Sequence, residues 1–234
     1  MRKIIIEKDI FLKFPGFKRG LILISDIENS FVNEKIERFL NEEIERRASQ
    51  RNLEHNYVKA WDEIHKKFGS NPNKFPPSIK ALLKRVEKGK KIPFINSVVA
   101  LFNYISLKYL IPCGGDDVGK IEGNLCLGFA KGNEIFVPLG SHQEENPEPG
   151  EVIYYDDKTL NVMCRKWNWR NGDFSKITEN TKKIVINVDG ADIVPESLIK
   201  EAKDELAELL KENCRASLIT DLLSSKKNEI VINL

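Results

Sequence analysis

The chain has 234 residues, which suits one large domain or one domain with an extension. Hydrophobic residues make up 41% and charged residues 31%, the proportions of an ordinary soluble globular protein. No apolar stretch approaches the roughly 20 residues that a membrane span requires, and the apolar run near the N-terminus is too short for a signal peptide. These features argue against a helical membrane span and predict a cytoplasmic protein without a membrane partner.

The cysteines predict a reduced protein. Cys113, Cys126, Cys164 and Cys214 are spread along the chain without a CxxC pair, as expected for mostly buried thiols. Zinc ligands usually lie closer together in sequence, and the chain has only 3 histidines. We therefore expect no metal and no organic cofactor.

Charge is distributed unevenly, although the net charge is only +2. Residues 1–93 contain 21 Lys and Arg against 13 Asp and Glu, and residues 94–234 contain 16 against 22. A basic part joined to an acidic part favours a surface for a polyanion, but chance clustering on solvated helices would explain the pattern equally well. We predict a basic α/β part over residues 1–93 that packs on a core of residues 94–234, so that the two form one compact unit.

Hydrophobic periodicity predicts strands and helices without strict alternation. Short apolar runs predict strands over residues 3–6, 21–24, 124–130, 135–139, 152–155, 160–165, 184–188 and 230–233. Apolar residues at helical spacing predict helices over residues 30–49, 55–68, 79–88, 95–109 and 195–212. Ser78 is the expected cap of the third helix. This mixture predicts an α+β fold.

The predicted helix 79–88 is strongly basic on one side. With the two residues after Gly89, it carries six bases against the single acid Glu87; these are Lys80, Lys84, Arg85, Lys88, Lys90 and Lys91. A helix flank of this composition can bind phosphates. A solvated lysine face would have the same composition, so both interpretations stay open.

A glycine pair followed by two acids comes directly after the helix 95–109, which Pro112 ends. Gly114 and Gly115 allow close approach to a ligand and offer backbone N–H donors, and we expect them in a loop with Asp116 and Asp117. Ester hydrolysis needs donors for an oxyanion and an acceptor that positions water. An ordinary turn with solvated aspartates is the alternative.

Bases and tryptophans alternate between residues 165 and 170. In an extended segment Arg165, Trp167 and Trp169 would share one face, while Arg170 would lie on the other. Tryptophan stacking combined with arginine–phosphate contacts is one way to hold a single-stranded RNA end. Two core tryptophans with a polar edge would produce the same pattern.

Together these segments resemble the tRNA-binding editing domain of the phenylalanyl-tRNA synthetase beta chain, and most closely a stand-alone branch of that family. The resemblance covers most of the chain. It rests on residues 96–99 leading into Asn103-Tyr104, on residues 112–117, 129–134, 139–140 and 164–170, and on Thr178 and Thr181 before a strand. Each motif alone is weak, and their combination is fairly specific.

The resemblance implies a mixed sheet sandwich with flanking helices. It also implies a free-standing trans-editing hydrolase that cleaves the ester between a wrong amino acid and the acceptor end of tRNA, and it implies no ligase activity. The expected catalytic residues are Gly114, Gly115, Asp116 and Asp117. The expected substrate contacts are Asn103, Tyr104, Glu122 and Asn187, and the expected tRNA contacts are Lys80, Lys84, Arg85, Lys88, Arg165, Trp167, Trp169 and Arg170.

Two residues depart from the pattern of the synthetase domain. That domain has a histidine at the position of Gly114 and a glutamate at the position of Asn187. A hydrolase with this sequence must therefore hold its water with other groups or act on a different substrate. The proximity of Asp116, Asp117 and Glu122 in sequence favours a polar or basic substrate side chain. The alternatives are a non-catalytic tRNA- or RNA-binding module with the same fold, and a small-molecule hydrolase or binder that never meets RNA.

Overall fold

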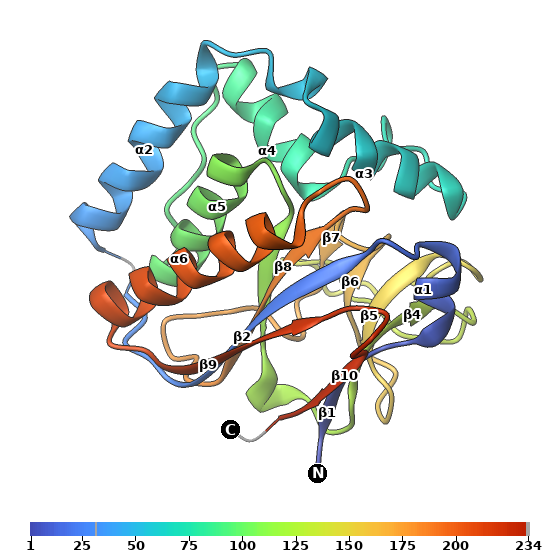
Figure 1. The fold of residues 1–234 in the computed structure, drawn as a ribbon. Helices are drawn as coiled ribbons and strands as arrows, with labels where there is room; N and C mark the ends of the chain where they lie inside the picture. The colour runs from blue at the N-terminus through green and yellow to red at the C-terminus, as the bar shows by residue number, and fades with distance from the viewer. Residues whose placement is uncertain (31, 233–234) are drawn as a thin grey trace.

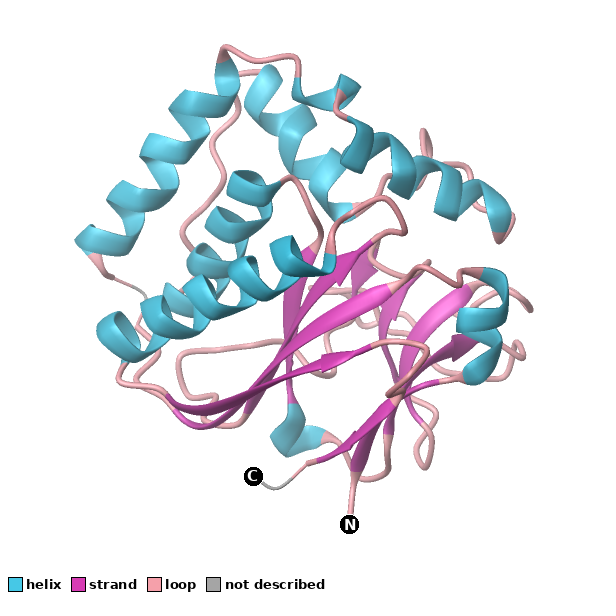
Figure 2. Cartoon of the chain, in the orientation of Figure 1, coloured by secondary structure: helices cyan, strands magenta, loops and turns pink. Residues whose placement is uncertain are grey.

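Two β-sheets and a set of helices build the molecule, with most of the helices gathered on one side (Figures 1 and 2). The computed structural model describes residues 1–30 and 32–232. Phe31 and Asn233, which belong to the predicted helix 30–49 and the predicted strand 230–233, lie outside those residues. The architecture confirms the predicted α+β fold with a mixed sheet.

The larger sheet has six strands. Strands β1 and β4 run parallel and the other neighbours antiparallel, so the sheet is mixed. Its order is β10 (Glu229–Val231), β1 (Lys3–Ile6), β4 (Leu125–Phe129), β5 (Val152–Asp156), β6 (Val162–Arg165) and β7 (Arg170–Asn171). The hairpin of β5 and β6 is the one that the sequence predicts.

The smaller sheet is fully antiparallel and carries the segment with the glycine pair. Its order is β3 (Cys113–Asp117), β8 (Ile184–Gly190), β2 (Lys18–Asp26) and β9 (Ser217–Leu223). Strand β3 lies at an edge and pairs with β8 over five residues. The prediction of a loop at residues 112–117 was therefore wrong, because this pairing compensates for the low strand propensity of glycine.

The helices follow the predicted periodicity. The structure has α1 (Lys8–Lys13), α2 (Glu34–Ala48), α3 (Asn56–Lys67), α4 (Ser78–Glu87), α5 (Ser97–Tyr109) and α6 (Glu196–Cys214), with short 3₁₀ helices η1 (Asn52–Glu54) and η2 (Val118–Lys120). Helix α1 and strands β7 and β9 were not predicted. Pro77 occupies the N-cap position of α4, so Ser78 is its first residue rather than its cap. The predicted strand 135–139 makes only isolated bridges.

Helix α5 delivers the chain to strand β3. Asn96 caps the helix by accepting a hydrogen bond from the Val99 N–H at 3.0 Å. Leu110 adopts a left-handed conformation with φ of 58°, which ends the helix two residues before Pro112. Helices α5 and α6 lie against the smaller sheet (Figure 2), and this packing fixes where the glycine pair lies.

Strands β1 and β2, both from the first 93 residues, lie inside the two sheets, and the division at residue 93 stays a prediction. The four cysteines are free and buried, as the sequence predicts. Within residues 1–30 and 32–232, no helix combines the length and the apolar character that crossing a bilayer requires.

Trp167 lies in an aromatic cluster between the helices and the sheets. Its side chain is 2% exposed, and its ring packs edge-on against Phe17 at 4.9 Å, Phe14 at 5.1 Å and Trp61 at 5.4 Å between centroids. Lys166 and Trp167 both have positive φ angles, so the segment between β6 and β7 is a turn and not extended. The shared face predicted for Trp167 and Trp169 therefore does not exist.

We expect Trp167→Ala to lower the free energy of unfolding by about 3–5 kcal/mol, because the change leaves a large cavity in the aromatic cluster. Urea unfolding followed by circular dichroism measures this loss. Trp169→Ala is the matched control, since that ring is half exposed and its removal should cost much less. Equal losses for the two variants would contradict the assignment of Trp167 to the core.

Candidate functional site

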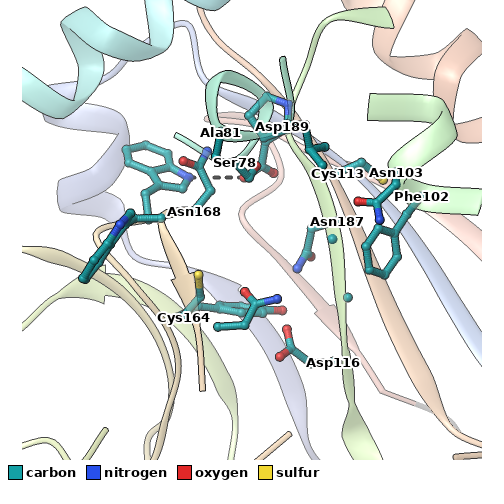
Figure 3. Close-up of a pocket in the computed structure, with 18 of the residues that line it drawn as sticks. Ser78, Ala81, Phe102, Asn103, Cys113, Asp116, Cys164, Asn168, Asn187 and Asp189 are labelled. Carbon is teal, nitrogen blue, oxygen red and sulfur yellow. Dashed lines mark hydrogen bonds between the residues drawn. The ribbon is translucent and has the colours of Figure 1, made fainter. Parts of the chain in front are cut away.

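A cavity of about 260 Å³ opens between strand β3, helices α4 and α5, and the turn that joins β6 to β7 (Figure 3). Residues from segments far apart in sequence meet there. The lining includes the predicted site residues Arg85, Asn103, Gly114, Gly115, Asp116, Trp167, Trp169 and Asn187. It also includes residues that the sequence did not single out, among them Arg19, Tyr154, Asn168 and Asp189.

The pairing of β3 with β8 decides which side chains face the cavity. Gly114 lies opposite Asn187 and Asp116 lies opposite Val185, so Gly114, Asp116 and Asn187 share one face of the sheet. Asp116 and Asn187 extend into the same space (Figure 3). A Cβ atom on Gly114 would meet nothing within 4 Å, whereas one on Gly115 would lie 2.6 Å from the Val185 carbonyl oxygen. Position 114 therefore tolerates a side chain, and position 115 requires glycine.

The same ladder directs the two glycine N–H groups differently. Asp189 donates its N–H to the Pro112 carbonyl at 3.0 Å. The alternation of an antiparallel ladder then places the N–H of Gly114 toward β8 and that of Gly115 away from it. The glycine pair thus offers one outward donor instead of the expected two.

Asp116 is the buried acid of the cavity. It is 7% exposed, and its Oδ1 accepts a hydrogen bond from the Ser175 hydroxyl at 2.6 Å. Burial raises the pKa of Asp116 to about 6, even though the Ser175 hydrogen bond and the charge of Arg19 act in the opposite direction. Near neutral pH the group is therefore a carboxylate that can readily take up a proton.

A buried ion pair belongs to the lining of the cavity. Arg19 Nε lies 2.6 Å from Asp189 Oδ1, and Arg19 Nη2 lies 2.8 Å from Asp189 Oδ2. The indole N–H of Trp167 also donates to Asp189 Oδ2, at 3.2 Å. Both charged residues are nearly inaccessible, at 2% and 4% exposure. Both carboxylate oxygens of Asp189 therefore accept hydrogen bonds inside the protein.

Several buried polar atoms of the cavity residues have no hydrogen-bond partner within the described chain. They are Arg19 Nη1, Tyr154 Oη, Asn168 Nδ2 and Asn187 Oδ1. Buried polar atoms in folded proteins almost always bond to protein, water or a ligand. These four atoms, one of them on a hydroxyl that can both donate and accept, belong to residues that line one cavity, as expected of a binding site for a small polar group.

The buried ring of His65 contacts the side-chain amide of Asn168. It is fully buried, and its Nε2 lies 3.1 Å from Asn168 Oδ1. Burial lowers the pKa of His65 to about 4, so the ring is neutral at physiological pH. The His tautomer sets which of the two atoms donates; with the proton on Nε2, the ring donates to Oδ1 and Asn168 Nδ2 is the donor beside the cavity.

Helix α4 and the turn after β6 form the mouth of the cavity. Ser78, Ala81, Leu82 and Arg85, spaced for one face of α4, line it. Arg85 is exposed, as is Lys88, and Lys84 is half exposed. Trp169 is half buried with its ring edge-on to Phe75, and the exposed guanidinium of Arg170 lies 5.8 Å from the Trp169 ring centroid.

The sequence is similar to a known domain family and to a subunit of a known enzyme. Residues 60–215, about two thirds of the chain, match the B3/4 domain. The chain belongs to the B3/4 domain family. It is 27% identical over 110 residues to the phenylalanine–tRNA ligase beta subunit of Fusobacterium nucleatum, which covers 47% of this chain and 13% of that subunit. The family that the sequence resembles is thereby confirmed.

A solved structure is also similar to this B3/4 domain. It is an N-terminal fragment of the phenylalanyl-tRNA synthetase beta subunit from Pyrococcus horikoshii, with a TM-score of 0.49 and 13% identity. The match covers 91% of this chain and 49% of that fragment. The chain thus spans about half of the fragment and a small part of the Fusobacterium subunit.

Three predicted site residues lie outside the cavity of this B3/4 domain. Asp117 accepts hydrogen bonds from the Gly119 N–H at 2.9 Å and from the Thr181 hydroxyl at 3.1 Å, and it caps η2. Glu122 is exposed and pairs with Lys158 at 3.0 Å. The hydroxyl of Tyr104 bonds to Glu205 of helix α6. These three side chains have hydrogen-bond or ion-pair partners outside the cavity, and their predicted roles stay predictions.

Three predicted RNA contacts are corrected. Arg165 is buried in a bidentate ion pair with Glu151, at 2.8 and 2.9 Å. Lys80 is 8% exposed and lies 2.6 Å from Asp62. Trp167 is held in the aromatic cluster, is 2% exposed and donates its indole N–H to Asp189. Neither base is free to bind a phosphate, and the buried indole cannot stack on a nucleobase.

Sequence reasoning missed the ion pair of Arg19 and Asp189 and the contact of His65 with Asn168. Arg19 precedes one apolar strand and Asp189 follows another, 170 positions later. A charged residue at the end of each of two buried strands was the available signal. Among residues 1–30 and 32–232, no group of three or more His, Cys, Asp or Glu side chains comes together as a metal site.

We expect Asp116→Asn to stabilise the protein at neutral pH. The folded-state pKa of about 6 lies above the ordinary value of 3.8, so the folded wild type loses stability as pH rises from about 4 to about 6. The variant lacks this loss, and its free energy of unfolding at pH 7 should exceed that of the wild type by up to about 3 kcal/mol. Denaturant unfolding at pH 4 and at pH 7 measures the difference. If the difference in free energy of unfolding between the variant and the wild type is the same at pH 4 and at pH 7, the raised pKa of Asp116 is contradicted.

Proposed function

We propose that this B3/4 domain hydrolyses mischarged aminoacyl-tRNA in trans. The observation that supports this function is the cavity, in which a buried carboxylate and several unpartnered polar atoms lie beside an exposed basic helix. The family and the named ligase relative support a role connected with tRNA. An aminoacyl ester offers a carbonyl oxygen as acceptor and an ammonium group as donor, and both match the lining of the cavity.

Asp116 is the residue that would position and activate water. Its carboxylate accepts a hydrogen bond from a water molecule and takes a proton as the water oxygen attacks the ester carbonyl carbon. The bond between the carbonyl carbon and the ribose oxygen then breaks. The proton passes to the ribose oxygen, and the products are the free amino acid and tRNA with an intact hydroxyl. A pKa of about 6 makes Asp116 a competent base at neutral pH.

The mouth of the cavity suits the end of an RNA strand. Trp169 is half exposed, so its ring can stack on the terminal base of the acceptor end. Lys84, Arg85 and Lys88 of helix α4 and Arg170 beside Trp169 would bind the phosphates that follow. These residues retain the roles expected from the sequence, whereas Lys80, Arg165 and Trp167 do not.

The aminoacyl group would occupy the cavity beside Gly114 and Asn187. The synthetase domain has a histidine at the position of Gly114 and a glutamate at the position of Asn187. Here the two residues lie opposite each other on β3 and β8. The sequence favoured a basic substrate side chain because Asp116, Asp117 and Glu122 lie close together. Only Asp116 of these acids lines the cavity, and the base Arg19 lines it too. We therefore propose a small or polar aminoacyl group, without a special preference for a basic one.

We expect the purified protein to release the amino acid from at least one tRNA in a panel charged with small, polar, basic and aromatic non-cognate residues. Asp116→Asn should lower the rate on that substrate by about 10²–10⁴-fold, the usual contribution of a general base. Asp117→Asn is the matched control and should leave the rate unchanged, because Asp117 lies outside the cavity. Ester loss is measured with a radiolabelled amino acid.

Failure of every ester in the panel would refute the hydrolase. Retained tRNA binding would then favour the non-catalytic RNA-binding module, since Gly114 and Asn187 stand where the resemblance leads us to expect two ionisable groups, a histidine and a glutamate. Loss of both activities would favour a small-molecule function.

A second test concerns the basic helix. Replacing Lys84 and Arg85 by alanine should weaken tRNA binding and reduce the slope of log affinity against log salt by about 1–2, because up to two phosphate contacts are lost. Filter binding between low and moderate salt measures the slope. Lys200→Ala with Lys211→Ala removes the same charge from the exposed face of α6 and should leave the slope unchanged. Equal slopes for wild type and the α4 variant would show that α4 does not contact RNA.

A further inference from the structure

We infer that Arg19 is the side chain that stabilises the oxyanion formed during ester hydrolysis, and that Asp189 is its positioning residue. The inference rests on the proposed function and assigns a role that the glycine pair was expected to fill. The backbone limits the glycines, because the Gly114 N–H is turned toward β8 and only the Gly115 N–H points outward. A side-chain donor beside the cavity is therefore needed.

The geometry of the ion pair leaves one end of the guanidinium available. Asp189 engages Nε and Nη2 of Arg19, which are the two nitrogens on one side of the planar group. Nη1 carries two further N–H donors and has no partner among the described residues. Arg19 is among the residues that line the cavity, and its side chain is 2% exposed. In the inferred role, a group bound in the cavity is the acceptor that Nη1 lacks within the described chain.

The guanidinium is held rigidly. Asp189 cannot turn away, because Trp167 also donates to its Oδ2. The Arg19 Cζ atom lies 5.0 Å from the centroid of the Tyr154 ring and 5.7 Å from that of the Phe17 ring, so aromatic groups pack against the guanidinium. A donor that is already oriented stabilises charge in the transition state without the cost of reorganisation.

Arg19 and Asp116 have complementary roles. During attack the carbonyl π electrons move to the oxygen, and the resulting oxyanion accepts hydrogen bonds from Nη1 while Asp116 holds the proton taken from water. The electrons return to re-form the carbonyl as the bond to the ribose oxygen breaks. Both residues line the same cavity, and the charge of Arg19 lowers the pKa of Asp116 while burial raises it by more.

A test must separate this role from a purely structural one, because breaking one half of a buried ion pair strongly destabilises a protein. The double variant Arg19→Met, Asp189→Asn removes both charges at once and keeps the net charge and an acceptor for the Trp167 indole. The matched control is Arg165→Met, Glu151→Gln, which removes a second buried bidentate pair outside the cavity. Thermal unfolding confirms that each variant is folded at the assay temperature.

Two measurements are made on these proteins. The first is kcat and KM on the best mischarged tRNA. The second is the Kd for adenosine 3′-aminomethylphosphonate, a tetrahedral anion that resembles the oxyanion, relative to the Kd for adenosine. We expect the Arg19 double variant to lose about 10²-fold in kcat with little change in KM, the usual effect of removing an oxyanion donor. Its preference for the phosphonate over adenosine should fall at least tenfold, with adenosine binding unchanged. The Arg165 control should keep both properties.

The outcomes distinguish this inference from the proposed function. Absence of hydrolysis by the wild type would refute the proposed function. An unchanged kcat in the Arg19 double variant would overturn the inference alone. A phosphonate preference that survives the loss of Arg19 would also overturn it, whether or not the wild type hydrolyses an ester. Equal losses in the Arg165 control would show that the effect is general destabilisation, and this too would overturn the inference.

Discussion

The ion pair between Arg19 and Asp189 is the interaction on which the site depends. The two residues lie directly opposite each other on β2 and β8, so the pair joins the two inner strands of the smaller sheet near one end of their ladder. Through the indole of Trp167, Asp189 also reaches the turn of the larger sheet. Burying two charges costs several kcal/mol per ion unless hydrogen bonds compensate. Here three hydrogen bonds converge on Asp189, and one interaction therefore joins both sheets at the cavity.

The turn after β6 shows how packing enforces this arrangement. Lys166 and Trp167 adopt left-handed conformations with φ of 46° and 66°, which are unfavourable for residues with a side chain by about 1–2 kcal/mol each. Burial of Trp167 among four aromatic rings outweighs that cost. The turn in consequence directs Trp167 inward to Asp189 and leaves Asn168 and Trp169 at the cavity. The strained turn thus places the polar side chain of Asn168 and the aromatic side chain of Trp169 beside the cavity.

The sequence predicted most of the helices and strands because their apolar residues follow clear periods. It also brought Gly114, Asp116 and Asn187 into one site, since the family motifs mark those positions. Strand β3 was missed because a glycine pair has little strand propensity, and its pairing with β8 is decided by tertiary structure. Trp167 was assigned to the wrong face because alternation holds only in an extended segment, and Lys166 and Trp167 form a left-handed turn. Arg165 lies in β6 and is buried by its ion pair with Glu151, a partner that the local pattern does not reveal. Arg19 and Asp189 lie too far apart in sequence for any local pattern to connect them.

The charges in the cavity constrain its ligand. Arg19 and Asp189 neutralise each other, and the Asp116 carboxylate adds one negative charge above its pKa of about 6. An unpaired buried anion is costly, so the cavity favours a ligand with one positive charge. Every aminoacyl ester carries such a charge on its α-ammonium group, whatever its side chain. The ammonium group would meet Asp116 and the unpartnered oxygen of Asn187, while the carbonyl oxygen would meet the donor Nη1 of Arg19. The polarity of the cavity thus suits the part that all aminoacyl esters share, and the space at Gly114 is left for the side chain that distinguishes them.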